Sequence, residues 1–258
     1  ADYVRGLFSK LQRKTGEAIA YLHDQERQGL QKFIGQVPWD HRPLLRTLAT
    51  QVGERIGEAD GVIVFDPSGF AKKGPMSVGV ARQWCGRLGK VENCQVGVFL
   101  FYACRHGHAP LDRRLFLPKE WAADPDRRRQ THVPEAVEYR ERWQIALDML
   151  DRCEGLPRAW VCADSEFGRA ARFRAELRRR QQRYLLDVPE NLLVRDLDEQ
   201  VQQPARRHGS LKKSPWQSVK GWAEAQPAGR WERFEVRAGE KGPLEVDAVM
   251  TRVQTMQD

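Results

Sequence analysis

Two aspartates, Asp66 and Asp164, each follow a short apolar run. Residues 62–65 (Val-Ile-Val-Phe) precede the first aspartate, and residues 159–163 precede the second. Such runs, followed by Pro, Ser or Gly, indicate buried strands that end in turns. If the two strands are neighbours, the two carboxylates meet at one edge of a sheet. Paired carboxylates form a site for a hard divalent cation, Mg²⁺ being the natural choice and Mn²⁺ the alternative.

A metal site of this kind would act on a phosphodiester, because two ions about 3.5–4 Å apart activate the attacking oxygen and stabilise the leaving oxygen. Basic residues follow both aspartates: Lys72 and Lys73 after the first, and seven arginines between residues 169 and 183 after the second. The alternative is that each aspartate only begins a turn after a strand, a common use of Asp. The paired occurrence beside basic segments favours the metal site.

These basic segments also supply the candidate DNA contacts. A helix with arginines along one side could lie against a phosphate backbone. A solvated basic face is the alternative for residues 169–183, and it stays open at this point. The candidate DNA-binding residues are Lys72, Lys73, Arg82, Arg169, Arg172, Arg179 and Arg183.

The composition fits a basic, globular protein. The chain has 258 residues and a net charge of +8, with 41% hydrophobic residues, enough for a real core. The positive charge favours a polyanionic partner. No apolar run approaches the roughly 18 residues that span a bilayer, and the N-terminus lacks the apolar core of a signal peptide. The five cysteines are never in CxxC spacing. We therefore expect a cytoplasmic, nucleoid-associated protein without structural zinc.

Hydrophobic periodicity divides the chain into three expected parts. Residues 1–58 have leucines at helical spacing and form a helical module, which is either a DNA-binding module or a cap on the next domain. Residues 59–189 form the catalytic core, and residues 190–258 alternate in a way that predicts a β-rich segment. Within the core we expect strands at 62–66, 77–82 and 95–104, a surface excursion at 110–134, a helix at 135–153, a strand at 159–164, a helix at 169–183 and a strand at 184–188.

A three-strand meander followed by helix, strand, helix and strand is the element order of the ribonuclease-H-like fold. The predicted fold class is therefore α/β, with a ribonuclease-H-like mixed sheet, an N-terminal helical module and a β-rich insertion segment. In that order the first strand is central and the fourth lies beside it and parallel to it. Asp66 and Asp164 would then face each other.

At these positions the sequence resembles insertion-sequence transposases of the DDE superfamily. Residues 64–98 are similar to the first catalytic block of that family, and residues 115–121, 163–169 and 240–246 are similar to later blocks in the same order. The resemblance implies that Asp66 and Asp164 are the first two acidic residues of a catalytic triad. It implies a DNA transposase that cleaves element ends and joins them to target DNA with Mg²⁺ or Mn²⁺, acting as a homodimer on DNA.

The third acidic residue of the family is a Glu on a helix beyond the insertion, and the sequence given shows no Glu between residues 190 and 258 on a convincing helix. We therefore expect a fragment or a shortened relative that is nearly inactive in cutting by itself. Glu166 is a candidate stand-in for the third carboxylate. The alternative functions are a catalytically deficient DNA-binding relative and a ribonuclease-H-like nuclease without strand transfer.

Three tryptophans in the last part of the chain carry a separate hypothesis. Trp216, Trp222 and Trp231 lie among basic residues and could stack on nucleobases while the cations contact phosphates. Tryptophans in a small sheet are more often part of its core, and this alternative is the favoured one. The basic residues are Lys212, Lys213, Lys220 and Arg230.

Overall fold

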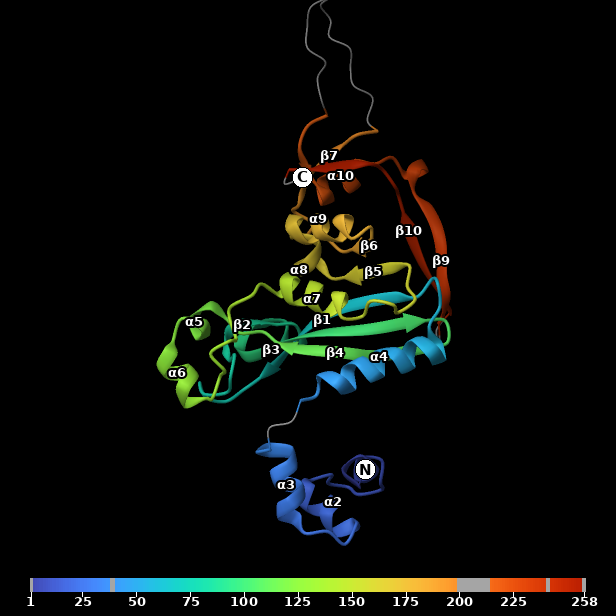
Figure 1. The fold of residues 1–258 in the computed structure, drawn as a ribbon. Coiled ribbons are helices and arrows are strands. Elements are labelled where there is room, and N and C mark those ends of the chain that lie inside the picture. Colours follow the sequence, from blue (N-terminus) through green and yellow to red (C-terminus); the bar gives the residue numbers. More distant parts are fainter. Residues whose placement is uncertain (1, 38–39, 199–213, 240–241, 257–258) are drawn as a thin grey trace, which may run out of the picture. The chain divides into compact units, whose positions relative to one another are not determined.

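The computed structural model describes residues 2–37, 40–198, 214–239 and 242–256. The chain forms two compact units, Ala1–Thr47 and Leu48–Asp258, which are described separately (Figure 1). Among the described residues, no helix combines the length and the apolar character needed to span a bilayer.

The N-terminal unit is helical, as its periodicity predicts. Thr15 caps one helix by accepting a hydrogen bond from the backbone N–H of Ala18 at 3.1 Å, which satisfies a donor that the first turn leaves unpaired. Ile19 of the same helix is fully buried. The helices of this unit are α1 (Asp2–Leu7), α2 (Gly16–Leu22) and α3 (Arg27–Gly35), and they precede α4 (Arg42–Ile56).

The second half of α4 belongs to the larger unit. Val52 is buried in the main core, and Leu48 and Ile56 pack against the same core. These three residues recur every four positions and therefore lie on one face of the helix. The two compact units therefore meet between Thr47 and Leu48, within α4, whereas the sequence places the end of the helical module at residue 58.

The larger unit is built on a mixed sheet that confirms the predicted fold class. In the described part of the chain this sheet has six strands: five follow the order β2-β3-β1-β5-β6, and β4 also pairs with β3. β1 is antiparallel to β3 and parallel to β5, which is parallel to β6 (Figure 1). The strands are β1 (Val62–Ala71), β2 (Ala81–Cys85), β3 (Lys90–Cys104), β4 (Gly107–Leu115), β5 (Trp160–Ala163) and β6 (Arg183–Leu186).

One face of the sheet carries the main core. Ile63 and Phe65 of β1 alternate onto this face and are almost fully buried. The ring of Phe65 lies 6.1 Å from that of Phe167 and 6.4 Å from that of Phe173, distances typical of packed aromatic pairs. The covering helices are α7 (Arg142–Asp151), α8 (Ser165–Gly168) and α9 (Ala171–Arg179).

Several predicted strand bounds are wrong. β1 does not end at Asp66 but continues to Ala71, because it pairs with β3 over ten positions. Gly69 makes this extension possible, since a Cβ at that position would lie 2.9 Å from the Cys85 sulfur. β3 begins at Lys90, five residues earlier than expected, and the strand expected at 77–82 is a loop as far as residue 80. Pairing with β2 explains the early start of β3.

The segment predicted as a surface excursion, residues 110–134, is instead part of the fold. It completes β4 and then forms α5 (Lys119–Ala122) and α6 (Pro125–Gln130). Trp121 of α5 is fully buried, and its indole N–H donates to the Val80 carbonyl at 2.7 Å. The Arg127 guanidinium stacks 3.7 Å from the centre of the Trp121 ring and also donates to the Pro75 carbonyl. These contacts fix the loop that follows Lys72 and Lys73.

Among the described residues, the last part of the chain is β-rich with one short α-helix. Trp222 is buried and donates its indole N–H to the Asp196 carboxylate at 2.7 Å, a carboxylate that also accepts from the Thr251 hydroxyl at 2.8 Å. Trp222 is therefore a core residue and not a stacking platform. Lys212 and Lys213 lie outside the described residues. The elements of this part are β7 (Leu193–Asp196), β8 (Gln217–Ser218), α10 (Val219–Glu224), the 3-10 turn Ala228–Arg230, β9 (Glu232–Gly239), β10 (Gly242–Ala248) and β11 (Val253–Thr255). A further 3-10 turn, Gly86–Leu88, lies between β2 and β3.

The substitution Trp121→Ala is expected to lower the free energy of unfolding by about 3–5 kcal/mol, because it leaves a large cavity and removes the hydrogen bond from the indole N–H to the Val80 carbonyl. Trp84→Ala is the matched control, since Trp84 is 59% exposed, and it should cost about 0.5 kcal/mol. Urea denaturation of the two variants measures both values. Equal losses would contradict the structural role of Trp121.

Candidate active site

Asp66 and Asp164 lie at corresponding positions of two adjacent parallel strands. The pairing of β1 with β5 runs in register from Val62 opposite Trp160 to Phe65 opposite Ala163. Each aspartate is the next residue after the last paired position. The structure therefore brings the two residues to one edge of the β1–β5 pair, as the sequence predicts. Asp66 is exposed and Asp164 is half-buried.

Asp164 also has a structural role. It is the N-cap of α8, and its Oδ1 accepts a hydrogen bond from the backbone N–H of Glu166 at 3.0 Å. α8 can approach the end of β6 because Gly168 has no side chain, and a Cβ there would overlap the Asp187 carbonyl oxygen. The turn-residue interpretation therefore describes part of what Asp164 does, while Asp66 lies within a strand.

The environment of Asp164 disfavours its charged form. Burial raises the pKa of the Asp164 carboxyl, and the negative charges of Glu166 and, more weakly, Asp66 raise the pKa further. Hydrogen bonds from the backbone N–H groups of Glu166 and Phe167 oppose this effect and lower the pKa. A carboxyl group in this position gains from a nearby cation, which would compensate its lost hydration.

Glu166 is held by an arginine. The Arg142 Nη1 atom donates to both oxygens of the Glu166 carboxylate, at 2.8 and 2.6 Å. The Arg142 Nη2 atom donates to the Gln83 side chain at 3.0 Å, and the guanidinium lies 4.5 Å from the centre of the Phe116 ring. Both Glu166 oxygens thus accept hydrogen bonds from a cation. This arrangement argues against the hypothesis that Glu166 stands in for the third carboxylate.

The two aspartates fit a metal that needs few protein ligands. Among the described residues there is no cluster of three or more His, Cys, Asp or Glu side chains arranged as a metal site. Mg²⁺ is commonly held by one or two carboxylates together with water and substrate phosphate oxygens. Asp66 and Asp164 supply that number of hard oxygen donors from rigid, central strands. The donor set therefore suits Mg²⁺ or Mn²⁺ and not a thiolate-binding ion.

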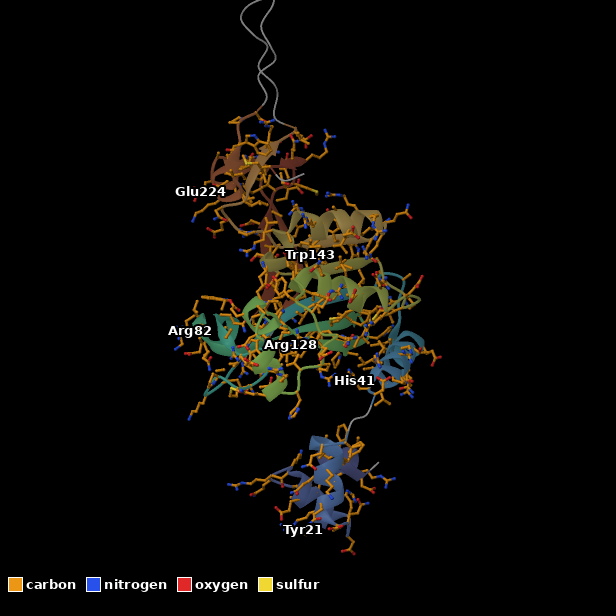
Figure 2. The ribbon with its side chains drawn as sticks, turned by 60° about the vertical axis from the view of Figure 1, so that its left-hand side comes forward. Tyr21, His41, Arg82, Arg128, Trp143 and Glu224 are labelled. Carbon is orange, nitrogen blue, oxygen red and sulfur yellow. The ribbon has the colours of Figure 1, made fainter. Side chains whose placement is uncertain are left out.

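All seven candidate DNA-binding residues are exposed cations. Lys72 and Lys73 follow β1 directly, in a loop that Asn93 holds by donating to the Lys72 carbonyl at 2.8 Å. Figure 2 shows Arg82 on the larger unit. Arg169 lines a pocket beside Asp164, and Arg172 is exposed on α9.

The other arginines of the basic segment 169–183 mostly have partners within the protein. Arg179, a predicted DNA contact, pairs with Glu176 at 2.9 Å. The Arg183 guanidinium lies 6.0 Å from the centre of the Trp160 ring. Arg174 is buried and donates to the Gly168 carbonyl at 2.6 Å. The predicted basic face is therefore only partly available to DNA.

A pocket of about 800 Å³ adjoins Asp164, and the sequence analysis did not identify it. Its walls come from β2, the segment after β4, the segment before α7, and α7 and α8. These segments are far apart in the sequence, so no local pattern reveals the pocket. The lining side chains include Trp84, Phe116, Tyr139, Glu141, Arg142, Trp143, Ser165, Glu166 and Arg169.

The chain is similar to several known proteins. The family model of the DDE superfamily endonucleases matches residues 1–243. The chain is 27% identical over 258 aligned residues to a protein named as a probable transposase for insertion sequence element IS701, from Microchaete diplosiphon. The alignment covers 98% of this chain and 62% of that relative. The chain thus spans less than two thirds of the length of the curated relative.

Solved structures with some likeness include two complexes of the Mos1 transposase. One is a paired-end complex with the left transposon end, with 11% identity, a TM-score of 0.25 and coverage of 70% of this chain and 56% of that one. The other is a pre-cleavage transpososome, with 12% identity, a TM-score of 0.24 and coverage of 70% and 57%. The fold assignment rests on the strand order described above and not on these similarities.

The raised pKa of Asp164 predicts a pH dependence of stability in metal-free protein. A carboxyl whose pKa is higher in the folded state than in the unfolded state loses stabilisation as the pH rises above about 4, the ordinary pKa of Asp. Wild-type protein in EDTA should therefore lose stability relative to Asp164→Asn as the pH rises from 4 to 7. Urea denaturation across this range measures the difference.

The matched variant Asp164→Ala separates the two roles of the side chain. Asn retains the capping oxygen, whereas Ala removes it and should cost about 1 kcal/mol relative to Asn at every pH. A constant stability difference between wild type and Asp164→Asn across the pH range would contradict the effect of burial on Asp164.

Proposed function

The chain belongs to the DDE superfamily of endonucleases, and from this premise we propose that it is part of a DNA transposase. The proposed reaction is metal-dependent cleavage of phosphodiesters at element ends, followed by joining of the ends to target DNA. The proposed catalytic residues are Asp66 and Asp164. Element ends and target DNA are the proposed partners, and the proposed assembly on DNA is a homodimer.

The observation that carries this proposal is the register of β1 with β5. This register supports Asp66 and Asp164 as a pair that can share one ligand. The match of the family model to residues 1–243 supports an endonuclease function for that pair. The relative named as a probable transposase aligns with nearly the whole of this chain, which supports the substrate class. β1 and β5 each have a neighbouring strand on both sides, so the backbone that carries the two carboxylates is rigid.

DDE superfamily enzymes use divalent metal ions, and we assign the ligands Asp66 and Asp164 to such an ion, either Mg²⁺ or Mn²⁺. A bound ion would supply Lewis-acid polarisation of the phosphate and would lower the pKa of an attacking water or hydroxyl. The protein groups have their own tasks. Asp164 is oriented by the backbone N–H of Glu166, and the exposed cations Lys72, Lys73, Arg82 and Arg169 would neutralise the DNA backbone around the reacting phosphate.

The experiment that tests this function measures metal-dependent stability. With a dissociation constant of about 1 mM, 10 mM Mn²⁺ should stabilise the wild-type chain by about 1.4 kcal/mol, because the ion binds only the folded state. Asp66→Asn and Asp164→Asn should each abolish this gain and leave the metal-free protein at least as stable as wild type. Thermal melts with and without Mn²⁺ or Mg²⁺ measure these effects.

The matched control is Asp60→Asn, which changes an exposed aspartate at the opposite end of β1. This variant should keep the full gain from Mn²⁺. If the wild type gains nothing from either ion, or if both aspartate variants at the site still gain stability, the metal-dependent nuclease is excluded. A DNA-binding relative without cleavage would then be the better description.

A further inference from the structure

The short helix α8 begins at one of the two candidate metal ligands, because Asp164 is its N-cap. We propose that Arg174 is a positioning residue for metal binding: it fixes the C-terminal end of α8 and thereby the place of the Asp164 carboxylate. Thr255, in β11, holds Arg174 in turn. This inference rests on the proposed function and adds to it, because it names a residue outside the metal site on which the affinity for the ion depends.

α8 is too short to be stable by itself. It has four residues, Ser165–Gly168. Isolated helices shorter than about 12 residues are marginal in water, so contacts with the rest of the fold must hold a single turn in place. The Asp164 carbonyl accepts hydrogen bonds from the N–H groups of Phe167 and Gly168 at 3.2 and 3.0 Å. Asp164 therefore moves with this turn whenever the turn shifts.

Apolar contacts hold one side of α8. The Phe167 side chain is buried, and its ring lies 5.5 Å from that of Phe173 in the neighbouring helix α9 (Figure 1). Gly168 lies so close to the Asp187 carbonyl oxygen that a Cβ could not fit between them. These contacts set how closely α8 approaches the sheet. Because hydrophobic packing is not directional, the orientation of the turn needs a hydrogen bond as well.

Arg174 supplies such a hydrogen bond from α9. Its Nη1 atom donates to the Gly168 carbonyl at 2.6 Å, and the residue is only 6% exposed. Gly168 is the last residue of α8, where carbonyl groups lack partners within the helix. A hydrogen bond from a charged donor is stronger than one from a neutral donor, and burial strengthens it further. This bond therefore fixes the end of α8 that lies opposite Asp164.

Thr255 holds the same guanidinium from a different part of the larger unit. The Arg174 Nη2 atom donates to the Thr255 hydroxyl at 3.0 Å, and Thr255 is also buried. Thr255 lies in β11, opposite Val194 of β7. An arginine side chain has many rotamers in solution, and two acceptors from separate elements restrict it to one of them. β11 thus contributes to the position of Asp164, although it supplies no metal ligand.

The position of Asp164 matters because few protein ligands are available. Asp66 and Asp164 approach the ion from two different strands, so a shift of α8 changes the gap that the ion must fit. Mg²⁺ tolerates little departure from octahedral geometry. Residues that orient a metal ligand accordingly influence metal affinity without touching the metal.

The test measures the affinity for Mn²⁺ and not stability alone. Thermal melts at Mn²⁺ concentrations from about 0.1 to about 50 mM give the dissociation constant, because only the gain over the metal-free protein enters the fit. Arg174→Met keeps most of the side-chain volume and removes the guanidinium, and it should weaken Mn²⁺ binding about tenfold. Thr255→Val should weaken binding by about threefold, and it is the deciding variant if Arg174→Met does not fold.

Two controls separate positioning from a general loss of stability. Thr255→Ser keeps the accepting hydroxyl and should leave the dissociation constant within about twofold of the wild-type value. Trp222→Phe removes a buried hydrogen bond to Asp196 of β7. This second control should lower the metal-free melting temperature but keep the wild-type affinity for Mn²⁺, because its contacts do not include Arg174 or α8.

The outcomes distinguish this inference from the proposed function. If the wild type binds Mn²⁺ and Thr255→Val and Arg174→Met bind it equally well, Arg174 has no positioning role, while the metal site stands. If Trp222→Phe weakens binding as much as Thr255→Val, general destabilisation explains the loss and the positioning role is again excluded. If the wild type itself gains no stability from Mn²⁺, the proposed metal-dependent function fails, and the positioning role fails with it.

Discussion

The parallel pairing of β1 with β5 is the constraint on which the rest of the site depends. Four paired positions, ending at Phe65 opposite Ala163, set the two aspartates at the same level of the sheet. A slip of one residue would send one carboxylate to the other face. The register is held by apolar packing, because Ile63, Phe65 and Val161 are fully buried under α7 and α9. The packing of the apolar core thus determines where the Asp66 and Asp164 carboxylates lie relative to each other.

The charged residues around Asp164 are themselves held by hydrogen bonds. Its carboxyl is partly desolvated beside a second acidic group, and Arg142 holds that second group in a bidentate pair. Arg142 in turn contacts Gln83 and Phe116, which connects the acidic edge to β2 and to the aromatic pocket. One arginine therefore joins the candidate metal site to the pocket beside it, and changes at Arg142 would disturb both.

The sequence was informative where function depends on local pattern. The apolar runs before Asp66 and Asp164 predict adjacent parallel strands, and the structure has them. The sequence was less informative where long-range packing decides. β4 and Trp121 lie in a segment whose prolines and charges resemble a surface loop, yet pairing with β3 and burial against Val80 make it part of the fold. The pocket around Trp84 could not be predicted, because its walls meet only in the folded chain.

The central claim, that Asp66 and Asp164 together hold one divalent ion, is tested most directly by iron-mediated backbone cleavage. Fe²⁺ would replace the bound ion, and ascorbate with peroxide would produce hydroxyl radicals at that position. The account predicts cuts near residue 66 and near residue 164 in the same sample, suppressed by excess Mg²⁺ and absent in Asp66→Asn. Cuts near only one of the two aspartates, or cuts that persist in Asp66→Asn, would contradict a shared site.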